Sequence, residues 1–446
     1  MKKAITLLLF FLVAYAPSKA TIYFPPVTGT NWDTVSLSSL GWCTDKMDSL
    51  INYLGNHHTK AFILLKDGKI VVEHYYGTFT ADSVWQWNSA GKSLTGFLTG
   101  LAQEQGYLNI QDSLPEYLHQ GFSSCNAANE NAMRIRHQLT MTTGFDDLYG
   151  TSTENHCTDD TCLVCIAPPG TRWAYHNAPY TLLHWVIDSA AHTTMNTFTR
   201  NNLLNTCGIT GTWISNIPAY PYDEIYASKA RAMARFGLLV LAGGKWNGNT
   251  IMHDTTYFNQ MLNSSQNINP SYGYLWWLNG KSSYRLPGYQ ININSPIVPN
   301  APPDMVAALG KNDQILNIVP SKGLVLVRMG EAWSTSQEVG TVVDDSIWIK
   351  LNAVFCNPTA INTISLSAQQ LQLYPNPAKE QLNIIYPEVH GLTTIHITGP
   401  DGKQVQTSIQ KNGHQATLNI LELPHGLYLI QVKNETGTYQ SMFLKN

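Results

Sequence analysis

The pattern of apolar and polar positions predicts a β-hairpin near each end of the first 356 residues. Residues 61–65 and 70–75 are rich in apolar and β-branched side chains, and an Asp-Gly turn separates them. Residues 315–319 and 324–328 repeat this arrangement around a second turn. Helical patterns fill the interval between the hairpins. We therefore expect an α/β fold in which one antiparallel sheet, closed by the two ends, carries a helical insertion.

The helices are predicted from apolar residues that recur with a helical period. Leu94, Phe97, Leu98 and Leu101 lie on one face of a helix that starts near Ser89. A further helix is expected to stop at a glycine, at residue 144. The remaining helical segments cover residues 34–54, 136–145, 179–191, 229–241 and 336–354.

The apolar runs become short after Cys356. Residues 357–370 are rich in Asn, Thr and Ser and are predicted to form a linker. Residues 371–446 contain only short strand patterns separated by Gly-containing turns, which predicts a small C-terminal β-sandwich without a catalytic constellation. The strand patterns cover residues 382–386, 393–397, 416–420, 427–432 and 441–444.

Residues 1–20 have the composition of a signal peptide. Lys2 and Lys3 precede an apolar run over residues 5–15, and small residues at 18–20 form a cleavage site. The apolar run is too short to span a bilayer, and no downstream segment is long enough. We therefore expect an exported mature chain without a transmembrane segment.

The overall charge narrows the range of partners. The 446 residues carry a net charge of −3, and only 13 % are charged. No basic stripe is present, so we expect no nucleic-acid partner. Aromatic residues make up 11 %, which suits an aromatic-lined cleft for a small-molecule or peptide substrate.

The cysteines suggest disulfides in an exported chain. A polar loop over residues 146–170 contains His156, Cys157, Cys162 and Cys165. A Cys-x-x-Cys pair with one flanking His is an incomplete zinc set, so we favour a disulfide-stapled loop, with Cys125 as a candidate partner and one thiol left over. A metal site at this cluster is the alternative.

Ser89 and Lys92 are candidates for nucleophilic chemistry. Three residues make about one helical turn, so the hydroxyl and the amine share a face, and the helix N-terminus adds backbone N–H groups where an oxyanion forms. The alternative is an N-cap serine beside a solvated lysine. A phosphate loop at Gly91 is excluded because position 86 is Gln.

Tyr175 and Asn177 form the second candidate motif. In extended backbone they point to the same side, whereas His176 points to the other and is interpreted as structural. A tyrosine hydroxyl near an amine shuttles protons, and the Asn177 amide suits both a substrate carbonyl and Lys92. A turn tyrosine and an Asx-turn asparagine are the alternative.

The third candidate motif runs from Gly310 to Gln314, where a predicted strand begins. A strand edge at Lys311 and Asn312 lends a backbone N–H and a cation to a cleft, whereas the alternative is an ordinary β-turn. Asp313 adds a carboxylate to this edge.

The three motifs together resemble the serine β-lactamase-like hydrolases, in the branch that holds class C β-lactamases, esterases, D-aminopeptidases and nylon-oligomer hydrolases. The resemblance covers about residues 40–355 and implies a hydrolase domain over 21–356 with a β-lactamase-like antiparallel sheet flanked by helices. It implies no metal and no cofactor. The residues it assigns are Ser89 as nucleophile, Lys92 and Tyr175 for proton transfer, and Asn177, Lys311, Asn312 and the backbone N–H of Gln314 for substrate and oxyanion.

The chain departs from this family at Asp313, because Lys-Thr-Gly or His-x-Gly is common in the third motif. The missing glycine places a carboxylate where the backbone usually runs close to substrate, which weighs against β-lactam hydrolysis more than against acyl transfer. We expect a secreted hydrolase that cleaves ester or amide bonds. The alternatives are a penicillin-recognising D,D-peptidase or β-lactamase, and a non-catalytic surface binding protein on the same scaffold.

The C-terminal residues 371–446 resemble a type IX secretion sorting domain. This resemblance implies passage through the type IX secretion machinery, followed by release or attachment at the cell surface. It depends on four segments: Tyr374-Pro-Asn-Pro-Ala378, Asp401-Gly-Lys403, Leu423-Pro-His-Gly-Leu-Tyr428 and Phe443-Leu-Lys-Asn446.

Overall fold

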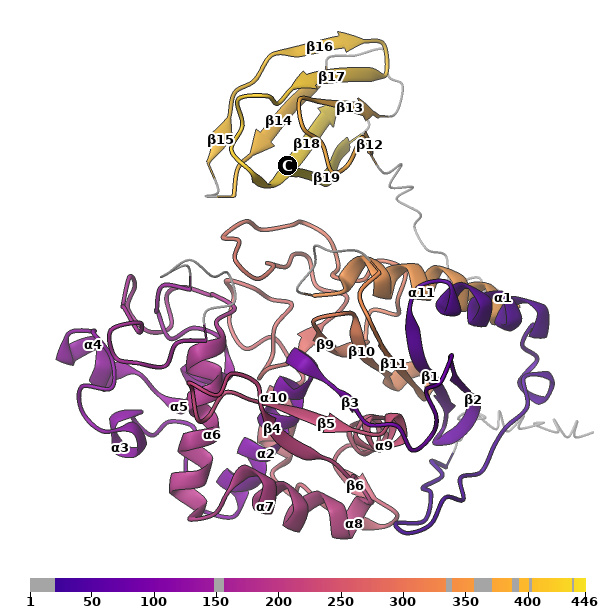
Figure 1. Cartoon of the computed structure of the whole chain (residues 1–446), viewed down its shortest axis with the longest axis vertical. Coiled ribbons are helices and arrows are strands. Elements are labelled where there is room, and N and C mark those ends of the chain that lie inside the picture. Colours follow the sequence, from indigo (N-terminus) through magenta and orange to yellow (C-terminus); the bar gives the residue numbers. More distant parts are fainter. Residues whose placement is uncertain are drawn as a thin grey trace, which may run out of the picture.

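The structure is a computed structural model of the whole chain, shown in Figure 1. It describes residues 21–147, 156–333, 339–356, 371–386, 393–400, 403–434 and 437–446. The predicted signal peptide and linker, and part of the 146–170 loop, lie outside the described residues.

The central antiparallel sheet is closed by the two ends of the hydrolase-like region, as predicted. Its strand order is β2-β1-β11-β10-β9-β8, and β1 pairs with β11 along its length, with Ile63 opposite Val327. The Asp-Gly turn between β1 and β2 takes positive φ at both residues, which a hairpin of this type requires. The strands are β1 (Thr59–Lys66), β2 (Lys69–Tyr75), β8 (Trp277–Leu278), β9 (Val306–Gly310), β10 (Gln314–Val319) and β11 (Leu324–Gly330).

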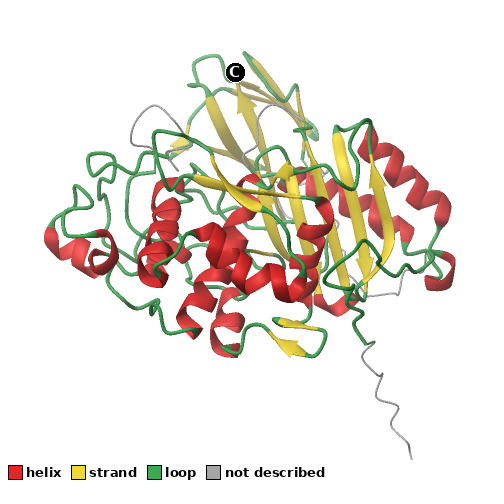
Figure 2. Ribbon diagram, turned by 60° about the horizontal axis from the view of Figure 1, so that its bottom comes forward, coloured by secondary structure: helices red, strands yellow, loops and turns green. Residues whose placement is uncertain are grey.

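Helices cover both faces of this sheet, as Figure 2 shows. Every residue of β9, β10 and β11 is buried, which explains their continuous apolar runs. Helix α9 (Ala230–Leu241) packs on β10 and β11 at Gly237, where a Cβ atom would lie 2.5 Å from Val325 Cγ1. Helices α1 (Thr44–Gly55) and α11 (Thr341–Val354) lie side by side on the other face (Figures 1 and 2).

The insertion between the hairpins is helical and also carries short strands. The helices are α2 (Gly91–Glu104), α3 (Pro115–Leu118), α4 (Ala127–Ala132), α5 (Ile135–Leu139), α6 (Asn177–Ala191), α7 (Met195–Thr199), α8 (Asn205–Cys207) and α10 (Thr255–Met261). Single turns occur at η1 (Ser38–Leu40), η2 (Asn88–Ala90), η3 (Arg200–Leu204) and η4 (Pro320–Lys322). The short strands are β3 (Trp85–Gln86), β4 (Thr212–Ser215), β5 (Glu224–Ser228), β6 (Lys245–Trp246) and β7 (Asn249–Thr250).

The predicted helix over residues 136–145 is wrong in its second half, because α5 ends at Leu139. The Thr140 hydroxyl lies 2.7 Å from that of Thr142 and donates to the Arg136 carbonyl, so the side chains compete with the helical hydrogen bonds. Met141 takes a positive φ of 56°, which a helix does not allow. The helix predicted over 34–54 also starts late, at α1, after the short turn η1.

Disulfides hold the cysteines of the predicted loop, so these cysteines are not ligands of the alternative metal site. Cys125 bonds to Cys165, as the sequence suggested, and Cys157 bonds to Cys162. Cys43 bonds to Cys356, which ties the start of α1 to the end of α11. The structure describes every cysteine of the chain, and the one left over is Cys207, whose burial raises the thiol pKa to about 12.

The C-terminal residues form a β-sandwich with a core of its own, as predicted. One sheet has the order β12-β13-β17-β16 and the other β15-β14-β18-β19. Within the described residues, no helix is long and apolar enough to cross a membrane. The strands are β12 (Gln372–Tyr374), β13 (Gln381–Ile385), β14 (Thr394–Thr398), β15 (Gln404–Val405), β16 (Ile409–Asn412), β17 (Gln415–Asn419), β18 (Gly426–Asn434) and β19 (Gly437–Lys445).

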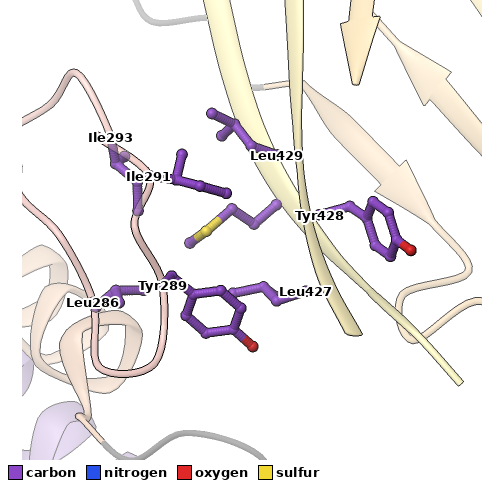
Figure 3. Close-up of a pocket in the computed structure, with 8 residues that line it drawn as sticks. Leu286, Tyr289, Ile291, Ile293, Leu427, Tyr428 and Leu429 are labelled. Carbon is purple, nitrogen blue, oxygen red and sulfur yellow. The ribbon is translucent and has the colours of Figure 1, made fainter. Parts of the chain in front are cut away.

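The sandwich touches the hydrolase-like region through β18 and β19, as Figure 3 shows. The backbone N–H of Asn294 donates to Gln440 Oε1 at 3.3 Å beside an apolar contact. The loop on the other side of that contact is held by Gln290, which donates to the Trp173 carbonyl at 3.0 Å. The apolar contact is lined by Leu286, Tyr289, Ile291, Ile293, Leu427, Tyr428, Leu429 and Met442.

Candidate active site

Ser89 lies in the single turn η2, which leads directly into the buried helix α2. The N-cap of α2 is Ala90, without a side-chain capping bond, so Ser89 is not the N-cap serine of the alternative interpretation. Asn88 has a positive φ of 49°, and its amide donates to the Lys311 carbonyl at 2.8 Å. The turn that carries Ser89 is therefore fastened to the edge of the central sheet.

Lys92 is buried and not solvated, since its exposure is only 3 %. Its Nζ atom lies 3.0 Å from Ser89 Oγ and donates to Asn177 Oδ1 at 2.7 Å. The rings of Tyr175 and Tyr180 flank the amine, with centroids 5.0 and 4.3 Å from Nζ. A hydroxyl, an amine and an amide thus meet in one enclosed place.

Tyr175 belongs to an aromatic wall beside Lys92. Its ring stacks on Trp277 with centroids 5.7 Å apart and an interplanar angle of 18°. The extended backbone ends one residue later, because His176 is the N-cap of α6 and Asn177 is already its first residue. His176 is buried, as its structural interpretation requires, and burial lowers its pKa to about 3.

The third motif brings the sheet edge against the turn that carries Ser89, at Gly310. A Cβ atom at this residue would lie 2.4 Å from the Trp87 carbonyl oxygen and 3.1 Å from Ser89 N, so only glycine allows this approach. Lys311 follows with an exposed side chain. The turn then continues through Asn312 with a positive φ of 61°.

Asp313 turns toward Trp333 and not toward Ser89, which corrects the expectation of a carboxylate at the substrate. Its side chain is buried and accepts from the Trp333 N–H at 2.9 Å. Arg328 donates to the backbone carbonyl of Asp313 at 2.7 Å. Burial raises the pKa of the Asp313 carboxyl. The missing glycine is accommodated by left-handed backbone, since Asp313 has a φ of 58°.

Gln314 also serves the sheet, because its side chain is fully buried between strands. Its amide donates to the Gly330 carbonyl at 2.6 Å and accepts from the Gly330 N–H at 3.1 Å. It donates in addition to the carbonyl of Asn312. The Gln314 side chain therefore fastens the turn to β11, and the Asp313 side chain fastens it to Trp333 beyond that strand. The backbone that reaches Ser89 is that of Gly310.

Two residues that adjoin this cluster, His156 and Asp223, are not predicted from the sequence. His156 Nε2 lies 3.5 Å from Asn177 Nδ2, and His156 Nδ1 lies 3.0 Å from Asp223 Oδ2. Asp223 is 2 % exposed. His156 was noticed only as a neighbour of Cys157, and nothing in the local sequence singles out Asp223.

A serine hydroxyl in contact with a buried amine, at the start of a helix and beside a strand edge, has the pairing of hydroxyl and proton acceptor that serine acyl transfer requires. The chain belongs to the Beta-lactamase family, whose sequence profile matches residues 48–339. Members of this family are generally serine hydrolases. A second profile, the secretion system C-terminal sorting domain, matches residues 372–446 and indicates a secreted or cell-surface protein.

Solved structures share the fold at low sequence identity. A putative β-lactamase from Bacteroides dorei has a TM-score of 0.56 and 13 % identity, over 71 % of this chain and 100 % of that one. A putative 6-aminohexanoate-dimer hydrolase from Bacillus anthracis has a TM-score of 0.54 and 15 % identity, over 72 % and 87 %. A penicillin-binding protein homologue from Caulobacter crescentus has a TM-score of 0.52 and 12 % identity, over 73 % and 99 %. No curated protein matches the chain significantly.

Proposed function

We propose that this protein is a secreted serine hydrolase that cleaves an ester or amide bond through an acyl-enzyme on Ser89. The observation that carries the proposal is the contact of 3.0 Å between Lys92 Nζ and Ser89 Oγ inside a buried cluster. On the surface, water would compete with the Ser89 hydroxyl for the lysine amine. A buried amine held by an amide is instead placed to take the serine proton.

In the first step, neutral Lys92 accepts the proton of the Ser89 hydroxyl while Oγ forms a bond to the substrate carbonyl carbon. The carbonyl oxygen becomes an oxyanion, which backbone N–H groups stabilise. We assign one donor to Ser89. The second was expected at Gln314, but Gly310 is the residue that lies against Ser89 N, so we assign it to the next N–H, that of Lys311.

In the second step, the tetrahedral intermediate collapses and the leaving group takes a proton, delivered from Lys92 through the Tyr175 hydroxyl. Water then attacks the acyl group, Ser89 Oγ departs with a proton, and the free enzyme is restored. Asn177 holds Lys92 in place throughout. The side chains of Lys311 and Asn312 are proposed to border the substrate at the sheet edge, and no metal or cofactor takes part.

The structure also bears on the alternative of a penicillin-recognising D,D-peptidase or β-lactamase. Asp313 motivated the doubt about β-lactams, and its carboxylate turns toward Trp333 and not toward Ser89. This alternative therefore stays open as a substrate class for the same site. A non-catalytic binding protein is less well supported, since it does not need the Ser89–Lys92 contact.

The proposed domain organisation of the chain fits an enzyme that is exported. Residues 1–20 are a signal peptide, 21–356 the hydrolase domain, 357–370 a linker, and 371–446 the sorting domain that the type IX secretion machinery recognises. The small-molecule or peptide substrate meets the enzyme outside the cell.

A parallel substrate screen tests the proposal. Wild type and Ser89→Ala are assayed with short p-nitrophenyl esters, D-aminoacyl p-nitroanilides and nitrocefin. We expect turnover of at least one class by wild type and none by Ser89→Ala. The matched control is Ser93→Ala one turn along, whose hydroxyl donates to the Leu275 carbonyl, and it should retain activity. Equal turnover by wild type and Ser89→Ala contradicts the proposal.

A further inference from the structure

His156 and Asp223 extend the cluster beyond the residues of the proposed mechanism. We propose that His156 is a positioning residue, which fixes the orientation of the Asn177 amide and thereby the place of Lys92, and that protonation of His156 disrupts this arrangement. The inference rests on the proposed function, because it concerns the proton acceptor of Ser89. It adds an acid-sensitive element to that site.

The two ends of the Asn177 amide face different partners. An amide group has an oxygen that only accepts and a nitrogen that only donates. The oxygen faces Lys92 Nζ at 2.7 Å, so the nitrogen must face the opposite way, where His156 Nε2 lies at 3.5 Å. Nε2 can accept only without a proton, and this orientation therefore requires a neutral imidazole with its proton on Nδ1.

Asp223 favours that tautomer. Its Oδ2 atom lies 3.0 Å from His156 Nδ1, close enough for the carboxylate charge to act on that nitrogen. The carboxylate is itself held, since Oδ2 accepts from Asn216 Nδ2 at 3.2 Å and its backbone N–H donates to the Tyr220 carbonyl. A negative charge beside Nδ1 keeps a proton on that nitrogen.

The other charged and titratable groups around His156 come from the neighbouring segments. His176 precedes Asn177 and stays neutral near pH 7, because burial lowers its pKa to about 3. Arg172 forms an ion pair with Asp147. Lys92 lies behind the Asn177 amide. The Cys157–Cys162 disulfide, which starts at the next residue, limits how far His156 can move away.

Protonation of His156 reverses the interaction with Asn177. The Nε2–H donor of His156 would then face the NH₂ donor of Asn177, which is unfavourable. A rotation of the amide that turns its oxygen toward His156 removes this conflict. Its NH₂ group then faces Lys92, and the contact that holds the amine is lost. Acylation of Ser89 is therefore expected to fall on the acidic side as His156 takes up a proton.

The test is the pH dependence of the rate at which a fluorophosphonate labels Ser89, measured on the full chain. His156→Gln keeps an acceptor for the Asn177 amide but does not titrate, so labelling should stay within about threefold of wild type at neutral pH and decline less than wild type on the acidic side. His156→Leu leaves the amide nitrogen unpaired, and labelling should slow about tenfold or more.

The control is His253→Gln, the same substitution at a histidine that is 69 % exposed and pairs with Glu104. It should leave the profile unchanged. An acidic limb that is the same in wild type and His156→Gln overturns the positioning role while leaving the proposed function intact. Absence of Ser89 labelling in wild type overturns the proposed function, and the positioning role with it. Thermal unfolding of each variant separates a folding defect from either result.

Discussion

The Lys92 amine lies 3.0 Å from the Ser89 hydroxyl, in a place where the lysine side chain is almost fully removed from solvent. Burial of an amine is costly unless polar partners or electron-rich rings surround it. Here the Asn177 oxygen and the faces of Tyr175 and Tyr180 provide that surrounding. The chain thus retains a buried amine beside a hydroxyl, which is the basis of the proposed chemistry.

Replacement of Tyr175 by Phe distinguishes the role of its hydroxyl from the packing of its ring. The ring stacks on Trp277, so the Tyr175→Phe variant should unfold at nearly the wild-type temperature. Loss of the proposed proton shuttle should lower kcat about 100-fold or more. The control is Tyr274→Phe, whose hydroxyl donates to Gln260, and steady-state kinetics should show wild-type turnover for it. An undiminished kcat in Tyr175→Phe removes this residue from the mechanism.

A methyl group at Gly310 should displace the sheet edge from the nucleophile. The added Cβ would lie 2.4 Å from the Trp87 carbonyl oxygen, so the strand or η2 must shift. A shift of the oxyanion donors should reduce kcat/KM about 100-fold in Gly310→Ala. Far-ultraviolet circular dichroism should show that the fold is kept. Full activity in a folded variant would mean that this edge does not stabilise the oxyanion.

The buried carboxyl of Asp344 should make the stability depend on pH. Burial raises its pKa to about 8 from 3.8, although Asn317 donates to it. The folded state therefore holds a proton that the unfolded state releases between these values, so this contribution to stability is present below pH 4 and lost as the pH rises toward 8.

Thermal unfolding at pH 5 and pH 8 measures this effect. The wild-type Tm should be lower at pH 8 than at pH 5. The Tm of Asp344→Asn, which carries no titratable group at this position, should decrease less. Asp48→Asn on the exposed face of α1 is the matched control and should behave like wild type. An equal change in Tm for wild type and Asp344→Asn would contradict a protonated Asp344 in the folded state.

The contact between the sorting domain and the hydrolase domain can be tested by crosslinking. Ile291 and Leu427 line the same apolar contact, so cysteines at these positions should join under a short bismaleimide in the intact chain. Cysteines at positions 291 and 411 are the control, because Lys411 is on β16 and does not line the contact. Gel mobility before and after linker cleavage reports the crosslink. Equal yields for both pairs argue against a defined contact.

The fold was predictable where short-range signals decide it. The Asp-Gly turn and the apolar runs of β1, β10 and β11 specify the sheet. The helix over residues 136–145 was predicted too long, because period alone does not show that Thr140 bonds to the backbone and that Met141 takes positive φ. Competition of this kind depends on the packing around the segment.

The candidate site was predictable to a similar extent. One-turn spacing places Ser89 beside Lys92 whatever surrounds them. The directions of Asp313 and Gln314 depend on two successive left-handed residues in the turn, which the sequence does not reveal for Asn and Asp. His156 reaches Asn177 from a disulfide-stapled loop, and Asp223 comes from a distant segment, so only the tertiary structure brings them together.

The most direct test of the account is peptide mapping after reaction with a fluorophosphonate. We expect one modified peptide in wild type, with the adduct on Ser89, and no adduct in Ser89→Ala or Lys92→Met. Lys229→Met, at a half-exposed lysine paired with Asp82, should be labelled like wild type. An adduct on another residue, or equal labelling of Lys92→Met and wild type, would contradict a Ser89 nucleophile activated by Lys92.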